Sequence, residues 1–347
     1  MTLFVFNPEH DLALASGLSN FTAPHAGRRL RADLGYLPAL WAGPDDCVLV
    51  ENVEQARRAY GRLRARVGGA PRRFVDKSQL SRLDIDRIEP WGWDMALHSS
   101  LTRYGVAPET CAAVAEITAV REYSHRRYAA EVLRRLDWPA PLEATTLEAV
   151  EASSPFHPSI VVKAPWSSSG RGVRFVDGSL SDYHRGWIRN VIRQQGCVMV
   201  EPYYPKVKDF GMEFEAQPDG QIHYLGLSLF ETNNGAYMGN IVASENDKRD
   251  MISYYVSDSI IYNVRVKVMD ALHRVIGDHY VGPLGVDMMI LSKPDSQGFS
   301  VHPCVEINLR RTMGHVAIAM AEASPSAPPR VMQITLTDKY RIHIRRL

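Results

Sequence analysis

Two apolar segments in the C-terminal part of the chain carry acidic side chains. If these segments are buried strands, the acids need a cation or hydrogen-bond partners. Asp287 belongs to Gly-Val-Asp-Met-Met-Ile, and Glu306 and Asn308 belong to Val-Glu-Ile-Asn. The period of two along a strand would place Glu306 and Asn308 on one face, and a hairpin could bring Asp287 beside them. Such a face supplies the oxygen ligands that Mg²⁺ prefers. An isolated Glu-x-Asn is more simply a solvated strand face, but acids among apolar neighbours count against that alternative.

A lysine and a glycine-rich turn form the second candidate site. The sequence predicts a buried strand at 160–163 that ends in Lys163, a Ser/Gly-rich loop at 164–172, and a strand at 173–176. Backbone N–H groups of such a turn can contact phosphate oxygens, and lysine supplies a compact positive charge. The P-loop pattern is absent from the sequence. The alternative is a flexible hairpin with a lysine that reaches solvent.

Four further residues are candidates for substrate contacts. Arg310 and Arg311 follow the acidic segment directly and suit a phosphate, a carboxylate or a developing oxyanion; alternatively they are a surface pair that balances the acids. His10 and Asp11 follow the first predicted strand, and ligands commonly bind at the carboxyl ends of strands in an open α/β sheet. The alternative is that Asp11 caps a helix and His10 is a surface residue.

The bulk composition excludes several classes of protein. A chain of 347 residues usually forms two or three subdomains, and a formal net charge of +1 gives no global field for nucleic acid or an anionic membrane. The four cysteines form no CxxC pair, so neither a zinc site nor a disulfide framework is expected. The first residues lack the charged region of a signal peptide, and apolar runs are too short to span a bilayer. We expect a cytoplasmic enzyme.

Strand and helix patterns divide the chain into an α/β part and an α+β part. Alternation over residues 1–115 predicts an open, parallel α/β sheet, with strands at 3–6, 47–50 and 72–75 and helices at 53–67 and 94–104. Residues 116–200 predict a small α+β unit, in which Ser124 is the expected N-cap of an amphipathic helix. Residues 201–325 predict antiparallel strands with a polar stretch at 231–249 and a helix at 260–276, and residues 326–347 a basic tail.

In this order, the segments resemble the ATP-grasp superfamily over residues 121–321. The resemblance implies two α+β subdomains that sandwich ATP, preceded by a Rossmann-like α/β domain. It also implies ATP and Mg²⁺ as cofactors, with Mn²⁺ possible. Asp287, Glu306 and Asn308 match the metal ligands of the superfamily, and Arg310 matches an arginine near the transferred phosphate.

The resemblance also implies the nucleotide contacts. The segment after Ser124 is similar to the one that supplies a first phosphate-binding lysine, and that place falls on Arg126. Lys163 resembles the second such lysine. Residues 198–204 resemble the hinge strand that binds adenine, which makes Glu201 and Tyr203 candidates, while Asp209 or Glu213 would hold the ribose. The loop that closes over the triphosphate corresponds to Ser167, Ser168, Ser169, Gly170, Arg171 and Gly172.

The resemblance favours an ATP-dependent ligase that joins a carboxylate to an amine through an acyl-phosphate and releases ADP and phosphate. The substrates would be small molecules or peptides, with no nucleic-acid or membrane partner; the oligomeric state is not readable. Phosphoryl transfer or carboxylation is an alternative within the superfamily. A nucleotide-binding regulatory protein without turnover is a third hypothesis, which the joint presence of acids, lysine and arginine disfavours.

Overall fold

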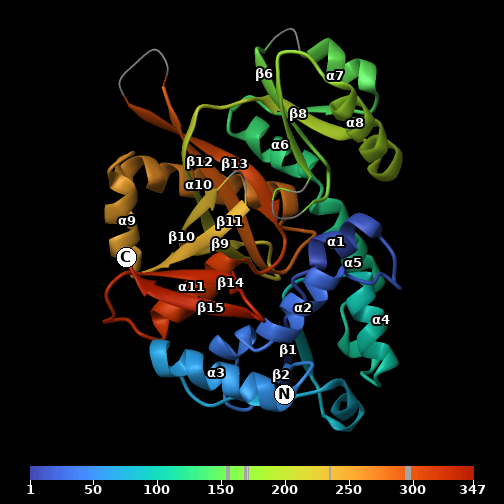
Figure 1. Cartoon of the computed structure of the whole chain (residues 1–347), viewed down its shortest axis with the longest axis vertical. Coiled ribbons are helices and arrows are strands. Elements are labelled where there is room, and N and C mark those ends of the chain that lie inside the picture. The colour runs from blue at the N-terminus through green and yellow to red at the C-terminus, as the bar shows by residue number, and fades with distance from the viewer. Residues whose placement is uncertain (154–156, 168–169, 171, 234–235, 294–297) are drawn as a thin grey trace.

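The computed structural model describes residues 1–347 apart from 154–156, 168–169, 171, 234–235 and 294–297. Within the described residues, the strands form one parallel four-stranded sheet, one antiparallel four-stranded sheet and one seven-stranded sheet. Figure 1 shows the seven-stranded sheet at the centre, with the antiparallel small subdomain at one end of the long axis and the N-terminal domain at the other. None of the described helices has the length and apolar character needed to cross a membrane.

The N-terminal domain is an open α/β unit, as the sequence predicts. Its strands run parallel in the order β3-β2-β1-β4, and the apolar strands β1 and β2 are buried. The fourth strand was not expected, because its short segment carries Arg87 and Glu89 and lies at the edge of the sheet. The elements are β1 (Thr2–Val5), α1 (His10–Ser16), α2 (His25–Leu34), η1 (Leu37–Leu40), β2 (Cys47–Leu49), α3 (Val53–Val67), β3 (Arg73–Val75), η2 (Lys77–Arg82), β4 (Arg87–Pro90), α4 (Met95–Arg103) and η3 (Pro108–Thr110).

The small subdomain is an antiparallel sheet of order β5-β8-β6-β7 covered by helices. The expected N-cap at Ser124 is wrong. An unpredicted helix runs up to this residue, whose backbone N–H bonds to Val120, and His125 instead caps the next helix by accepting from the N–H of Arg127. The elements are α5 (Val114–Tyr123), α6 (Arg126–Arg135), β5 (Leu142–Ala144), α7 (Leu147–Ser153), β6 (Ser159–Lys163), β7 (Val173–Asp177), α8 (Asp182–Gln195) and β8 (Val198–Pro202).

The seven-stranded sheet has the order β13-β12-β9-β10-β11-β14-β15. On β9, Phe210, Met212 and Phe214 are buried in one core with α10, whereas Glu213 points to the opposite face and contacts the start of α11. The stretch at 231–249, expected to be irregular, contains β11 and α9. The elements are β9 (Lys206–Ala216), β10 (Ile222–Asn233), β11 (Ala236–Val242), α9 (Glu245–Ser253), α10 (Asp258–Ile276), β12 (Gly282–Ser292), β13 (Phe299–Asn308), α11 (Met313–Glu322), β14 (Arg330–Leu336) and β15 (Tyr340–Arg346).

The last two strands connect the central sheet to the N-terminal domain. Residues 326–347, expected as a tail, include β14, which pairs with β11, and β15, which pairs with β14. Met332 on β14 is fully buried in the same hydrophobic cluster as Phe4 of β1 and Val316 of α11. The C-terminal hairpin therefore completes the core of the N-terminal domain.

This position of the hairpin predicts the effect of a core truncation. Met332→Ala removes a fully buried side chain and should lower the free energy of unfolding by about 2–5 kcal/mol, as large-to-small core changes do. Leu336→Ala, on the same strand but 53% exposed, should change it by less than about 0.5 kcal/mol. Chemical denaturation of the two variants measures both values. Equal, small effects would show that β14 contributes little to the core.

Candidate functional site

The acidic side chains meet on one face of the central sheet. Asp287 on β12 lies opposite Glu306 on β13, and Gly285 lies opposite Asn308. On the other side of β12, Gly285 lies opposite Glu213 of β9. Directly opposed residues of antiparallel strands point to the same face, so these acids and the asparagine form one acidic face. The predicted approach of Asp287 to Glu306 and Asn308 is confirmed by the antiparallel pairing of β12 with β13.

The electrostatics of the acidic face favour a cation. Burial and the nearby charges of Glu306 and Glu213 together raise the pKa of Asp287 to about 7, while Arg310 acts in the opposite direction. Carboxylates crowded in this way repel one another unless a proton or a cation lies between them. Two carboxylates and one amide oxygen are hard ligands that suit Mg²⁺ or Mn²⁺. The donor set therefore fits a divalent metal.

Arg126 connects the acidic face to the glycine loop. It begins α6 and is only 8% exposed. Its Nη2 lies 2.9 Å from Glu306 Oε1 and donates to Ser167 Oγ at 3.1 Å, while its Nε donates to the carbonyl of Ala164 at 3.0 Å. One guanidinium thus contacts a carboxylate of the central sheet and two residues of the loop predicted to close over phosphates.

Lys163 ends β6 and forms a close ion pair with Glu201 of the neighbouring strand β8. Both side chains are more than nine-tenths buried. The loop that follows folds back tightly, because a Cβ on Gly172 would lie 2.3 Å from the Cβ of Ser167, and Gly170 has a positive φ of 71°. Three predicted loop residues, Ser168, Ser169 and Arg171, lie outside the described part of the chain.

The remaining nucleotide candidates differ in accessibility. Tyr203 follows β8 and is 55% exposed, with its ring 6.0 Å from that of Phe175. Asp209 on β9 accepts from Lys206 at 2.7 Å and from Thr232. Glu213 is 3% exposed, whereas the Asp209 side chain is 15% exposed, and the ribose role of either residue stays a prediction.

Glu213 instead belongs to a buried network at the start of α11. Its Oε1 accepts from the hydroxyl of Thr312 at 2.7 Å, and its Oε2 lies 3.0 Å from His315 Nδ1. Gly314 allows this approach, because a Cβ there would lie 1.8 Å from Glu213 Oε1. Sequence reasoning missed Thr312 and His315, although Thr-x-x-His directly after Arg310 and Arg311 is a capping pattern next to a candidate site.

Arg310 joins the acidic face to the N-terminal domain. Its Nε and Nη2 each donate to Asp11 at 2.8 Å, and Nη2 also donates to Asn308 Oδ1 at 2.8 Å. Burial would raise the pKa of Asp11, but the ion pair with Arg310 outweighs it and holds that pKa below its usual range. Asp11 lies in the first turn of α1, whose N-cap is Glu9, so the alternative role of Asp11 as a helix cap is wrong.

Arg311 and His10 point into the N-terminal domain. Arg311 donates to Glu89 at 3.1 Å, and its guanidinium lies 4.9 Å from the ring centroid of Trp41. His10 is 1% exposed and its Nδ1 lies 3.5 Å from an oxygen of Asp94, so the alternative of a surface histidine is wrong. The role predicted for both residues at the substrate stays a prediction, since neither contacts the acidic face within the described residues.

A second cluster has atoms that could bind a metal, but these atoms bind other residues of the chain instead. His125, Glu143 and Cys197 place one ligand atom each within 4.8 Å of one another. However, His125 Nδ1 accepts the N–H of Arg127 at 3.0 Å, and Arg127 also binds Glu143 at 2.8 Å. Burial lowers the pKa of His125 to about 3, so its neutral ring carries the proton on Nε2, 3.5 Å from the Cys197 sulfur. That nitrogen has no lone pair for a metal.

Solved structures with the ATP-grasp fold resemble this chain. N5-carboxyaminoimidazole synthetase from Staphylococcus aureus, complexed with ADP, gives a TM-score of 0.54 at 14% identity and covers 96% of this chain and 82% of that chain. An ATP-grasp superfamily protein from Archaeoglobus fulgidus gives 0.53 at 14% identity and covers 100% and 99%. Biotin carboxylase from Campylobacter jejuni gives 0.50 at 12% identity and covers 96% and 75%. No protein-family model and no curated protein sequence matches the chain.

At these identities the likeness concerns the fold. The chain has the ATP-grasp fold, with a Rossmann-like α/β domain at its N-terminus, and the fold prediction is confirmed. The acidic face, the glycine loop and the strand that carries Glu201 surround one region between the small subdomain and the central sheet, because Arg126 contacts both sides.

The raised pKa of Asp287 predicts pH-dependent metal binding. A metal requires the carboxylate form, and a pKa of about 7 leaves most molecules protonated at pH values below it. Mg²⁺ affinity should therefore rise about tenfold between about pH 6 and about pH 8. Calorimetric titration with Mg²⁺ and a non-hydrolysable ATP analogue tests this, with Asp287→Asn as the control that should lose the dependence. A constant affinity across that range would contradict it.

Proposed function

We propose that the chain is an ATP-dependent ligase that joins a carboxylate to an amine through an acyl-phosphate and releases ADP and phosphate. The observation that carries the proposal is the position of Arg126, which bridges the glycine loop and Glu306. A γ-phosphate between these two groups would meet a cation, backbone N–H groups and a metal-binding face. The ATP-grasp fold and the ADP in the synthetase from Staphylococcus aureus support the choice of nucleotide.

Asp287, Glu306 and Asn308 would hold Mg²⁺, which neutralises phosphate charge and orients the transferred group. The protein side chains then act by binding and positioning, and no side-chain nucleophile is required. Lys163 would contribute a point charge to the phosphates, and Arg126 would exchange its contact with Glu306 for one with a phosphate oxygen.

Arg310 would border the acyl-phosphate, with Asp11 as its positioning residue. A guanidinium has five N–H donors. Here Nε and both donors of Nη2 are used by Asp11 and Asn308, and one donor of Nη1 is used by the carbonyl of Arg311. A single donor therefore remains for a substrate oxygen, which makes Arg310 a directional contact for one oxygen rather than a clamp for two.

The same fold is found in biotin carboxylase from Campylobacter jejuni, which makes carboxylation the alternative reaction. The two reactions differ in whether ADP release requires an amine. Incubation with ATP, Mg²⁺ and a panel of amino acids and short peptides, followed by mass spectrometry, separates them. The ligase proposal expects ADP formation only with an amine and a product that contains a new amide. ADP release that depends on bicarbonate and no amine would overturn it.

The metal assignment predicts the behaviour of Glu306→Gln. The change removes a charged metal ligand, so kcat should fall by about a hundredfold or more. The protein should stay folded, because the amide can still accept from Arg126 and the repulsion with Asp287 is relieved. Glu148→Gln, at an exposed position of α7, is the matched control and should keep full activity. Near-normal turnover of Glu306→Gln at saturating Mg²⁺ would contradict the assignment.

A test of the phosphate role of Lys163 must not leave a buried charge without a partner. Removal of Lys163 alone leaves Glu201 buried and unpaired, which is strongly destabilising. The test therefore uses the double variant Lys163→Met/Glu201→Gln, which removes both charges of the pair, and compares it with the unaltered chain. ATP binding should weaken about tenfold or more beyond any loss of adenosine binding, because only ATP offers phosphate oxygens. Calorimetry that finds equal losses for both ligands would assign Lys163 a structural role.

A further inference from the structure

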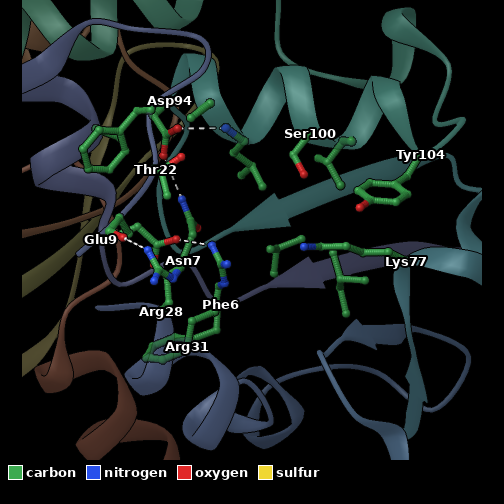
Figure 2. A pocket seen from close by; sticks show the side chains of 18 of the residues that line it. Phe6, Asn7, Glu9, Thr22, Arg28, Arg31, Lys77, Asp94, Ser100 and Tyr104 are labelled. Carbon is green, nitrogen blue, oxygen red and sulfur yellow. Dashed lines mark hydrogen bonds and ion pairs between the residues drawn. The ribbon is translucent and has the colours of Figure 1, made fainter. Parts of the chain in front are cut away.

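A cavity lies at the carboxyl edge of the N-terminal sheet. It has a volume of about 270 Å³, and its walls come from the ends of β1 and β2, from α2 and α4, and from the segment between α1 and α2. Figure 2 shows Lys77 and Tyr104 on one side of the cavity and Glu9, Asn7 and Arg28 on the other. The residues that line it do not include those of the acidic face or the glycine loop. The cavity is thus separate from the proposed ATP site.

The position of the cavity is the one that open α/β sheets use for ligands. Connections leave the carboxyl ends of neighbouring strands in different directions there and open a crevice. In the order β3-β2-β1-β4, the chain adds strands on one side of β1 and then places β4 on the other side. The cavity is bordered by the residues that follow these strands, among them Asn7, Glu51 and Asp94.

The acids of the cavity are already paired. Glu9 binds Arg31 through one oxygen, and its other oxygen is buried without a hydrogen-bond partner among the described residues. Glu51 lies 3.2 Å from the Nε of Arg31 and 3.4 Å from the ammonium of Lys77. The two oxygens of Asp94 accept from Asn7 at 3.0 Å and from the backbone N–H of Leu97 at 2.9 Å. Each carboxylate therefore has a partner within the chain, and the unpartnered oxygen of Glu9 is too buried to contact a ligand.

The donors of the cavity are less fully used. Arg28 donates through Nη1 to the carbonyl of Ala23 at 2.6 Å and has no acidic partner among the described residues. Arg103 at the end of α4 is exposed, and within the described part of the chain no polar contact of its side chain is found; the same holds for the side chains of Thr22 and Ser100. Two guanidinium groups and two hydroxyls are therefore available to an anion.

The rest of the lining is apolar. Leucine and valine side chains from four elements cover the cavity between the polar groups, and the ring of Tyr104 packs under Lys77, whose ammonium lies 5.5 Å from the ring centroid. Among these side chains are Val5, Leu49, Leu80, Leu97 and Leu101. A ligand that fills the cavity would place an apolar body against these residues and its charged group against Arg103.

We propose that this cavity is a second binding site, which takes a small organic anion with a carboxylate or phosphate head group and an apolar body. Arg103 and the hydroxyl of Ser100, three residues apart on α4, bind the head group, while Arg28 and Thr22 on the other side of the cavity can contact a polar group at the far end of the ligand. The site does not depend on the proposed ligase activity, because binding can be measured without turnover.

The probes are benzoate and phenyl phosphate, with benzyl alcohol as a neutral ligand of similar shape. Calorimetry and amide chemical shifts of the full chain should report saturable binding of at least one anion with a Kd of about 1 mM. The affinity for benzyl alcohol should be lower by about tenfold or more. Saturation with Mg²⁺ and a non-hydrolysable ATP analogue should leave that binding unchanged. Absence of saturable binding by both anions, or displacement by the analogue, would overturn the proposal.

Substitutions locate the bound probe. Arg103→Glu should weaken anion binding about tenfold or more, whereas Arg82→Glu, an exposed arginine of η2 outside the cavity, should not. Ser100→Phe should fill the cavity and abolish binding of the anions, while the thermal unfolding of the variant reports whether the domain is intact. Unchanged affinity in both Arg103→Glu and a folded Ser100→Phe would place the anions elsewhere and refute the site.

Discussion

The mutual repulsion of half-buried carboxylates on the central sheet is the constraint around which the other domains are arranged. Asp287 and Glu306 lie opposite each other on neighbouring strands, and the sheet itself supplies no cation to separate them. The compensating charges come from other parts of the chain: Arg126 from the small subdomain and Arg310, held by Asp11 of the N-terminal domain. Each domain therefore contributes a charged side chain to the same face, and assembly of the site requires that all three pack correctly.

The sequence alone predicts those parts of the site that depend on local features. Such features are the alternation of side chains along a strand, a glycine-rich loop, and acids that suit a metal ion. The pairing of Asp287 with Glu306 and the turn after Lys163 belong to this class. Tertiary packing determines the features that were missed. The strands β14 and β15 are amphipathic only in relation to the core of the N-terminal domain, and β11 lies in a polar segment that reads as a loop. Helix propensity likewise gave Ser124 as a cap, because nothing local shows that α5 continues to Tyr123.

Side-chain direction was the harder part of the site to predict. Adjacent arginines on one strand end point in opposite directions: Arg310 turns to the acidic face, whereas Arg311 turns to Glu89 and Trp41. The sequence contains no signal for this difference, since both residues follow the same acids. The partner of each is a residue more than 200 positions away in the chain, and only the packing of the N-terminal domain brings it near.

The two cross-domain arginine contacts differ in how readily a ligand can replace them. Glu306 is 26% exposed at the side chain and binds Arg126 through one contact, so water can replace Arg126 at the carboxylate, whereas the buried Arg126 can leave only for another acceptor. Arg310 binds Asp11 through two parallel hydrogen bonds and Asn308 through a third, a geometry that is both stronger and more directional. In the proposed function, a phosphate would take Arg126 from Glu306 and free that carboxylate for a metal, while Arg310 would keep its orientation. The same face can in this way change partners at one end and stay fixed at the other.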